Sequence, residues 1–211
     1  MGPTVFAFIA GAYVLGSLSF AVIVSKLLGM EDPRSYGSRN PGATNVLRSG
    51  NRTAAVLTLL GDGLKGTAAV LIAKYVGPRY GVNEAGVAWV ALAVIVGHMW
   101  PMFFNLKGGK GVATAMGVMF GLNGWLGLSV ALVWLLVARI WRYSSLAAML
   151  SLGLSPLIGV FFLPHGNPEL GITMVIGLLV FYRHRDNLIK LLTHQEKKIG
   201  EAPRTPADPN Q

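Results

Sequence analysis

The chain has 211 residues, of which 53% are hydrophobic and only 13% are charged, about half the charged fraction of an ordinary soluble domain. This composition argues against a water-soluble fold, and the absence of cysteine excludes disulfides, iron–sulfur clusters and thiol nucleophiles. The 18 Lys and Arg residues against 9 Asp and Glu residues favour anionic lipid headgroups and phosphorylated substrates as partners of so apolar a chain, and no nucleic acid is expected.

Long uncharged runs predict helices that cross a membrane. The runs from Thr4 to Ser25 and from Ala85 to Leu106 each have 22 residues, enough to cross about 30 Å of hydrocarbon at about 1.5 Å per residue. In chain order we expect spans at 3–28, 53–77, 85–105, 110–122, 124–141, 144–163 and 168–184. The predicted fold class is an all-α polytopic membrane protein with about seven transmembrane helices.

The uncharged run from Gly111 to Ala138 is compatible with one tilted helix or with two short helices that turn near Asn123. With a break at Asn123, 15 of the 18 Lys and Arg residues fall on one side of the membrane, in segments 26–52, 105–110, 139–143 and from 183 onward. Because cytoplasmic loops collect basic residues, we expect two helices, the N-terminus outside and the C-terminus in the cytoplasm.

We expect a single transmembrane domain over residues 1–199. Residues 200–211 contain Pro203, Pro206 and Pro209 among small polar residues, so this tail is predicted to be a disordered cytoplasmic segment.

The segment after the first span combines cationic, hydroxyl and amide side chains with glycine. Between residues 34 and 48 it holds three arginines, four hydroxyl groups, two asparagines and two glycines. Glycine lets backbone N–H groups approach an anion, hydroxyls and amides donate hydrogen bonds, and arginine binds phosphate with two bonds at once. A solvated basic loop is the alternative interpretation.

A second candidate anion site is Asn105-Leu106-Lys107-Gly108-Gly109-Lys110-Gly111. Three glycines surround two lysines at the predicted start of a helix, where backbone donors and the helix dipole favour an anion. The motif is not a Walker A loop, because Lys110 is followed by Gly111 and not by Ser or Thr, so it does not imply ATP.

Two further polar clusters lie at the cytoplasmic ends of predicted spans: Arg142-Tyr143-Ser144-Ser145 and Tyr182-Arg183-His184-Arg185-Asp186-Asn187. His184 and Asn187 are three residues apart and share a helix face, where they could orient a substrate hydroxyl or phosphate. Basic stop signals at the lipid headgroups are the alternative.

Ionisable residues inside spans are costly unless they are paired. Asp62 and Lys65 are three residues apart in the second span, so we expect them to neutralise one another, with a proton or substrate role as the alternative. No two of the four histidines are four residues apart and no carboxylate pair accompanies them, so neither a metal site nor a cofactor is predicted.

These segments together resemble the bacterial acyl-phosphate-dependent glycerol-3-phosphate acyltransferases of the PlsY type. The resemblance rests on Gly37-Ser38-x-Asn40-x-Gly42-Ala43-Thr44-Asn45-Val46 with Arg48, on Gly97-His98-x-x-Pro101 through Lys107–Thr114, and on His184-Arg185-x-Asn187. Two departures are Arg39, where the family often has a small residue, and the less recognisable stretch Thr193–Glu196.

The resemblance implies transfer of a fatty acyl group from acyl phosphate to the 1-hydroxyl of glycerol 3-phosphate, giving lysophosphatidic acid and phosphate. It implies a multi-pass protein of the bacterial inner membrane whose active site faces the cytoplasm, with membrane lipids around it and no obligatory protein partner. The expected catalytic residues are Ser38, Lys107, His184 and Asn187. The expected substrate-binding residues are Asn40, Gly42, Thr44, Asn45, Arg48, Gly108, Gly109, Lys110, Gly111 and Ser145.

We expect Lys107, Lys110 and neighbouring amides to hold a phosphate and stabilise the developing oxyanion, while Ser38, Asn45 and Arg48 hold the other substrate. Either a substrate phosphate or His184 would take the hydroxyl proton. A membrane transporter for an organic phosphate is the alternative function, but it requires polar groups along a path between the two faces, whereas here they gather at one face.

Overall fold

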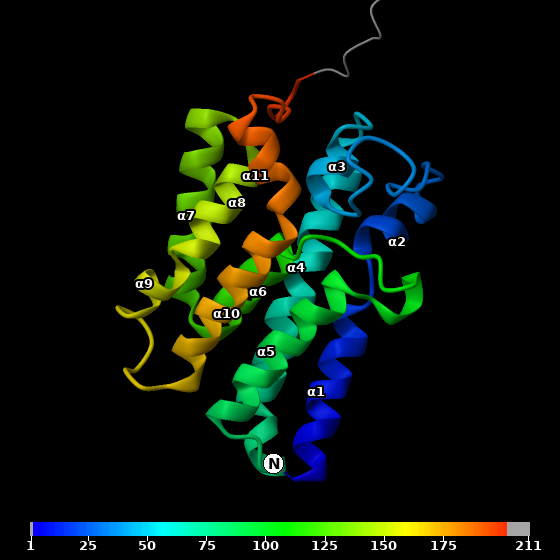
Figure 1. Ribbon diagram of the computed structural model, residues 1–211. Coiled ribbons are helices and arrows are strands. Elements are labelled where there is room, and N and C mark those ends of the chain that lie inside the picture. Colours follow the sequence, from blue (N-terminus) through cyan, green and yellow to red (C-terminus); the bar gives the residue numbers. More distant parts are fainter. Residues whose placement is uncertain (1, 202–211) are drawn as a thin grey trace, which may run out of the picture.

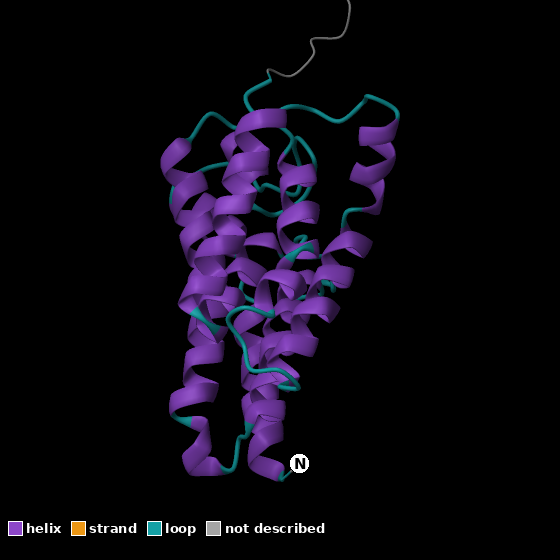
Figure 2. Cartoon of the chain, turned by 90° about the vertical axis from the view of Figure 1, so that its left-hand side faces the viewer, coloured by secondary structure: helices purple, strands orange, loops and turns teal. Residues whose placement is uncertain are grey.

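A computed structural model describes residues 2–201, and within this range the chain forms only helices and loops (Figure 2). The helices are α1 (Pro3–Gly16), α2 (Phe20–Leu27), α3 (Ala43–Leu47), α4 (Arg52–Tyr75), η1 (Gly77–Tyr80), α5 (Glu84–Met99), η2 (Met102–Phe104), α6 (Val112–Leu122), α7 (Gly124–Trp141), α8 (Ser144–Gly153), α9 (Ser155–Gly159), α10 (Pro168–Arg183) and α11 (Arg185–Leu192). The predicted all-α class is confirmed for the described residues. Of the predicted disordered tail, residues 200–211, the structure describes only Gly200 and Glu201, and the rest lies outside the described range.

The outer surface of the bundle is apolar. Leu57 and Leu64 on α4 and Leu132 and Leu136 on α7 are among many large apolar side chains that face outward. Within residues 2–201, three helical segments are long and apolar enough to cross a membrane, namely Arg52–Tyr75, Glu84–Phe104 and Gly124–Trp141, and the bent pair α1 and α2 would add a fourth. This surface is what a hydrocarbon environment requires of a protein.

Several expected spans are interrupted. The segment 3–28 contains two helices, α1 and α2, bent by 44° at residues 17–19. The carbonyl of Leu18, freed at this bend, accepts a hydrogen bond from Lys65 Nζ on α4 at 2.5 Å. The expected span 144–163 contains two helices, α8 and α9, which meet at Leu154. α5 ends at Met99, seven residues before Leu106, and the loop that follows supplies its capping partners.

The predicted break at Asn123 is confirmed. α6 ends at Leu122 and α7 begins at Gly124, with the Asn123 side chain accepting hydrogen bonds from the N–H groups of Trp125 at 2.9 Å and Leu126 at 3.2 Å. An N-cap asparagine starts the second helix by satisfying donors that have no partner inside the helix.

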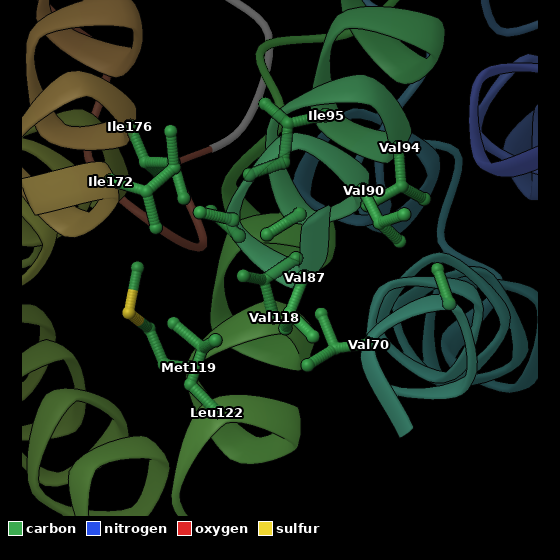
Figure 3. Packing of buried hydrophobic residues seen from close by; sticks show 14 of the residues in the cluster. Val70, Val87, Val90, Val94, Ile95, Val118, Met119, Leu122, Ile172 and Ile176 are labelled. Carbon is green, nitrogen blue, oxygen red and sulfur yellow. The ribbon is translucent and has the colours of Figure 1, made fainter. Parts of the chain in front are cut away.

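Glycine allows the central helices to pack backbone against backbone. A Cβ built on Gly117 of α6 would lie 1.9 Å from the carbonyl oxygen of Gly63 on α4, and one on Gly66 would lie 2.3 Å from that of Thr114. Small residues at helix crossings are a common solution in membranes, where packing replaces the hydrophobic effect between helices. Around these contacts, side chains of α4, α5, α6 and α10 form one apolar core, in which Val70, Val94, Val118 and Ile176 are labelled (Figure 3).

The ends of the bundle differ in character. The start of α1, η1 and the start of α5 lie at one end, whereas α3, α11 and the loop between α2 and α3 lie at the other (Figure 1). α10 continues into α11 toward that second end, so the start of α1 and the end of α11 lie at opposite ends of the bundle. The polar motifs of the sequence belong mainly to the end that carries α3 and α11.

Candidate active site

A cleft of about 930 Å³ opens between the loop that precedes α3, the start of α8 and the segment that follows α11. Four predicted site residues line it: Ser38, Thr44, Arg48 and Asn187. Its other cationic side chains are Lys190, Lys197 and Lys198, and its carboxylates are Glu31, Glu196 and Glu201. The cleft is therefore polar on both sides and carries more positive than negative side chains.

Asn45 organises the first wall of the cleft. Its Nδ2 group donates to the carbonyls of Pro33 at 2.7 Å and Tyr36 at 3.3 Å, and its Oδ1 accepts from the N–H of Ser38 at 2.9 Å. The Asn45 side chain is buried, and Gly37 passes it with a φ of +59° and no room for a Cβ, which would lie 2.3 Å from Oδ1. The predicted binding residue Asn45 thus holds the loop that presents Ser38.

The same wall is tied to the neighbouring helix. Thr44 Oγ1 and Ser144 Oγ lie 3.1 Å apart, which joins the start of α3 to the start of α8. Gly42 is the N-cap of α3, and a Cβ there would lie 2.9 Å from Nδ2 of Asn40. Asn40 and Gly42 therefore shape the turn into α3, while the exposed side chains of Ser38 and Arg48 face the cleft.

The opposite wall is a chain of hydrogen bonds. Lys110 Nζ donates to Oδ1 of Asn187, and Nδ2 of Asn187 donates to Oε1 of Glu196 at 2.7 Å. Ser145 Oγ donates to the same Glu196 oxygen at 2.7 Å. The segment carrying Glu196 is fixed to the start of α8 by Arg142, whose carbonyl accepts from the N–H of Ile199 at 2.7 Å. Four residues from distant parts of the sequence are thereby joined.

The glycine-rich loop, residues 105–111, differs from the expected phosphate-binding site. The N–H of Gly108 donates to the carbonyl of Met99 at 3.2 Å, and the N–H of Gly109 donates to that of His98 at 3.1 Å. These two amides cap the end of α5, so their N–H groups already have partners, and phosphate binding by Gly108 and Gly109 stays a prediction. The donors left for an anion are the Lys110 side chain and the first-turn N–H groups of α6. These N–H groups follow Gly111 and have no partner within the helix.

The two lysines of the motif have different environments. Lys107 is exposed, whereas Lys110 is partly buried against Asn187. Burial lowers the pKa of the Lys110 ammonium, and the negative charge of Glu196 opposes this change. Lys110, which lies in the loop before α6, is the lysine that the structure connects to the cleft.

His184 lies just beyond the end of α10 and is buried. Its Nδ1–H donates to the carbonyl of Val180 at 2.8 Å, an arrangement that leaves Nε2 as an acceptor. Burial, followed by the positive charge of Lys110, lowers the pKa of His184 to about 4. The imidazole is therefore neutral at physiological pH.

Beneath the glycine-rich loop, the predicted pairing of Asp62 with Lys65 is confirmed. Lys65 Nζ lies 2.8 Å from Asp62 Oδ1 and donates to His98 Nδ1 at 3.0 Å, and all three side chains are buried. In the sequence, His98 belongs to the motif Gly97-His98-x-x-Pro101, and no pattern there associates it with this ion pair.

Replacing Asp62 with Asn is expected to lower the free energy of unfolding by about 3–5 kcal/mol, because it leaves the Lys65 ammonium buried without its counter-charge. Thermal unfolding of the purified protein in detergent measures the loss. Asp62→Asn combined with Lys65→Met should recover part of it, and the exposed Asp186→Asn serves as the control. An unchanged unfolding temperature in Asp62→Asn would contradict this account.

Comparisons with known proteins agree with this architecture. A family model described as glycerol-3-phosphate acyltransferase matches residues 6–194. A glycerol-3-phosphate acyltransferase from Chromobacterium violaceum is 56% identical over 200 residues, covering 95% of this chain and 97% of the relative. One from Neisseria meningitidis serogroup C is 54% identical over 192 residues, covering 91% and 96%.

Two solved structures share the fold. The crystal structure of PlsY (YgiH), an integral membrane glycerol 3-phosphate acyltransferase, in its glycerol 3-phosphate form is 40% identical, with a TM-score of 0.84 and coverage of 93% of this chain and 96% of that one. Its lysophosphatidic acid form is 39% identical, with a TM-score of 0.83 and the same coverage. The apolar outer surface, the polar cleft at one end and this similarity place the chain among integral membrane enzymes. The chain belongs to the glycerol-3-phosphate acyltransferase family, as the sequence motifs predicted.

Proposed function

We propose that the protein transfers a fatty acyl group from acyl phosphate to the 1-hydroxyl of sn-glycerol 3-phosphate, giving lysophosphatidic acid and inorganic phosphate. The hydroxyl oxygen forms the new ester bond to the acyl carbon, the bond from that carbon to the phosphate oxygen breaks, and the phosphate leaves with the electron pair. The observation that carries the proposal is the bonded series Lys110–Asn187–Glu196–Ser145 beside a cleft lined by Ser38 and Arg48.

The chemistry of the substrates fits these side chains. Both substrates carry phosphate, which Arg48 can bind with two charge-assisted hydrogen bonds and Lys110 can stabilise as a compact charge. An acyl phosphate is already activated, so no covalent enzyme intermediate is needed. The substrate complexes named for the PlsY structures, with glycerol 3-phosphate and with lysophosphatidic acid, support the same acceptor and product here.

Residue roles follow from the two walls of the cleft. Ser38 and Arg48 hold one phosphorylated substrate, and Asn45 keeps Ser38 in place. Lys110, with Lys107 and the first-turn amides of α6, holds the other phosphate and stabilises the oxyanion that develops at the acyl carbon. Asn187 and Ser145 complete the site.

The pH dependence distinguishes two candidate bases. A phosphate monoester has a second pKa of about 6, whereas the pKa of His184 is about 4. Since a base is active only when it is deprotonated, a substrate phosphate as base predicts that kcat/KM for glycerol 3-phosphate falls as the pH drops through about 6. His184 as base predicts that activity persists to about pH 4. We expect the first result.

The measurement is a profile of kcat/KM between about pH 4 and 8 with saturating acyl phosphate. The phosphonate analogue of glycerol 3-phosphate, whose second pKa is higher, should shift the acidic limb upward. A limb that stays in place with the analogue would assign the proton to the protein and not to the substrate.

We infer further that residues 1–199 form one acyltransferase domain in the bacterial inner membrane, with about seven spans, the N-terminus outside and the cleft facing the cytoplasm. The concentration of basic residues at the end with α3 and α11 supports this orientation. The protein would act within membrane lipids and without an obligatory protein partner. A cytoplasm-active reporter fused after Gln211 should be active, and a silent reporter would contradict the orientation.

The test of the function uses purified protein in detergent with palmitoyl phosphate and radiolabelled glycerol 3-phosphate. An acyltransferase converts the label into lysophosphatidic acid. A transporter of organic phosphate, the alternative function, would make no product, because detergent removes the compartments that it needs. Recovery of unreacted glycerol 3-phosphate alone would refute the proposal.

A further inference from the structure

The glycine-rich loop is held from two sides, and one of its partners is a cation outside the predicted site. Arg183, the last residue of α10, donates from Nη2 to the carbonyls of Gly108 and Gly109, both at 2.9 Å, and from Nε to Gly109 at 3.2 Å. Its guanidinium also lies over the ring of Trp100, with Cζ 5.3 Å from the ring centroid. The planar fork of arginine suits two adjacent carbonyls.

We propose that Arg183 is a positioning residue, which presets the glycine-rich loop so that Lys110 reaches Asn187 and the cleft. This inference rests on the proposed function for its catalytic consequence, but not for its structural claim. Arg183 bonds backbone carbonyls and stacks on an aromatic ring, so it acts through the loop and not on a substrate.

The second side of the loop is the end of α5. The N–H groups of Gly108 and Gly109 donate to the carbonyls of Met99 and His98. The His98 ring is itself fixed by the buried Lys65 ammonium at 3.0 Å. Every N–H and carbonyl of the two glycines thus has a partner, and hydrogen bonds fix the loop to both α5 and α10.

The lack of space around the two glycines supports the same interpretation. A Cβ on Gly108 would lie 2.1 Å from the carbonyl oxygen of His98, and one on Gly109 would lie 2.2 Å from His98 Nε2. Neither residue has a positive φ. Glycine is therefore needed here for close approach to α5, while Gly111, with a φ of +79°, is needed for the turn into α6.

Hydrogen exchange of the loop amides tests the proposal without any substrate. Arg183→Gln should raise the exchange rates of the Gly108 and Gly109 amides by about 10- to 100-fold, because charge-assisted bonds to the loop are lost. Arg185→Gln removes the same charge two residues away, where the side chain lies over Tyr182, and should change them less than about twofold. Arg183→Lys keeps the charge but replaces the planar guanidinium with a single ammonium nitrogen, so it should give an intermediate exchange rate.

Activity supplies the second readout. Arg183→Gln should lower kcat/KM at least about tenfold, and its effect should be non-additive with Gly109→Ala, since both changes displace the same loop. Unchanged exchange in Arg183→Gln would overturn the positioning role even if activity fell, because a residue that only bound phosphate would behave in that way. If exchange rises in Arg183→Gln but the wild-type protein makes no lysophosphatidic acid, the proposed function is overturned and the positioning role stands.

Discussion

Replacing Lys110 with Ala is expected to lower the rate of lysophosphatidic acid synthesis by about 10²–10³-fold, the size of effect seen when one donor to a developing oxyanion is removed. Lys110 is the cation that connects the glycine-rich loop to the cleft, through its bond to Asn187. The change removes both the charge that stabilises the oxyanion and the partner of Asn187. Initial rates with palmitoyl phosphate and glycerol 3-phosphate measure the loss.

Two variants make this result specific. Lys110→Arg keeps the charge but not the compact ammonium, so an intermediate rate is expected. Lys26→Ala removes an exposed lysine at the end of α2 and should leave the rate within about twofold. Wild-type activity in Lys110→Ala would contradict the assignment of the oxyanion site to this loop.

Replacing Glu196 with Ala is expected to lower kcat/KM by roughly 10- to 100-fold, the usual cost of removing a group that orients binding residues. One oxygen of Glu196 accepts hydrogen bonds from both Asn187 and Ser145, and its loss leaves both donors without a partner. Steady-state kinetics, with each substrate varied in turn, measures the loss.

Glu196→Gln distinguishes orientation from charge. The glutamine amide oxygen can still accept from Asn187 and Ser145, so this variant should retain activity within several-fold of the wild type. Glu201→Gln, at the exposed end of the same segment, is the matched control for loss of one negative charge. Equal losses in Glu196→Gln and Glu196→Ala would show that charge and not orientation matters.

Much of the fold was predictable from local features. Asn123 between two apolar runs defined the break before α7, because its cap chemistry acts on the next three residues. The bend at residues 17–19 was not predictable, because it depends on Lys65, which binds the Leu18 carbonyl from 47 residues away. Nor was the capping of α5 by the loop amides that bond the carbonyls of Met99 and His98.

Most residues of the site were predictable from the sequence, but the hydrogen bonds between them were not. The motifs named Lys110, Asn187 and Ser145, yet their common partner Glu196 lay in a stretch where the family pattern was weak. The composition of the loop also could not reveal that the Gly108 and Gly109 amides cap the end of α5. Arg183 looked like one basic residue among several at a helix end, and only its distance to two carbonyls separates it from Arg185.

The most direct test of the central claim is the identity of the acyl donor, measured with purified wild-type protein and glycerol 3-phosphate. With palmitoyl phosphate, we predict that lysophosphatidic acid and inorganic phosphate form in equal amounts, and that acyl-CoA or acyl carrier protein gives no product. Synthesis from acyl-CoA in the absence of acyl phosphate would contradict the account.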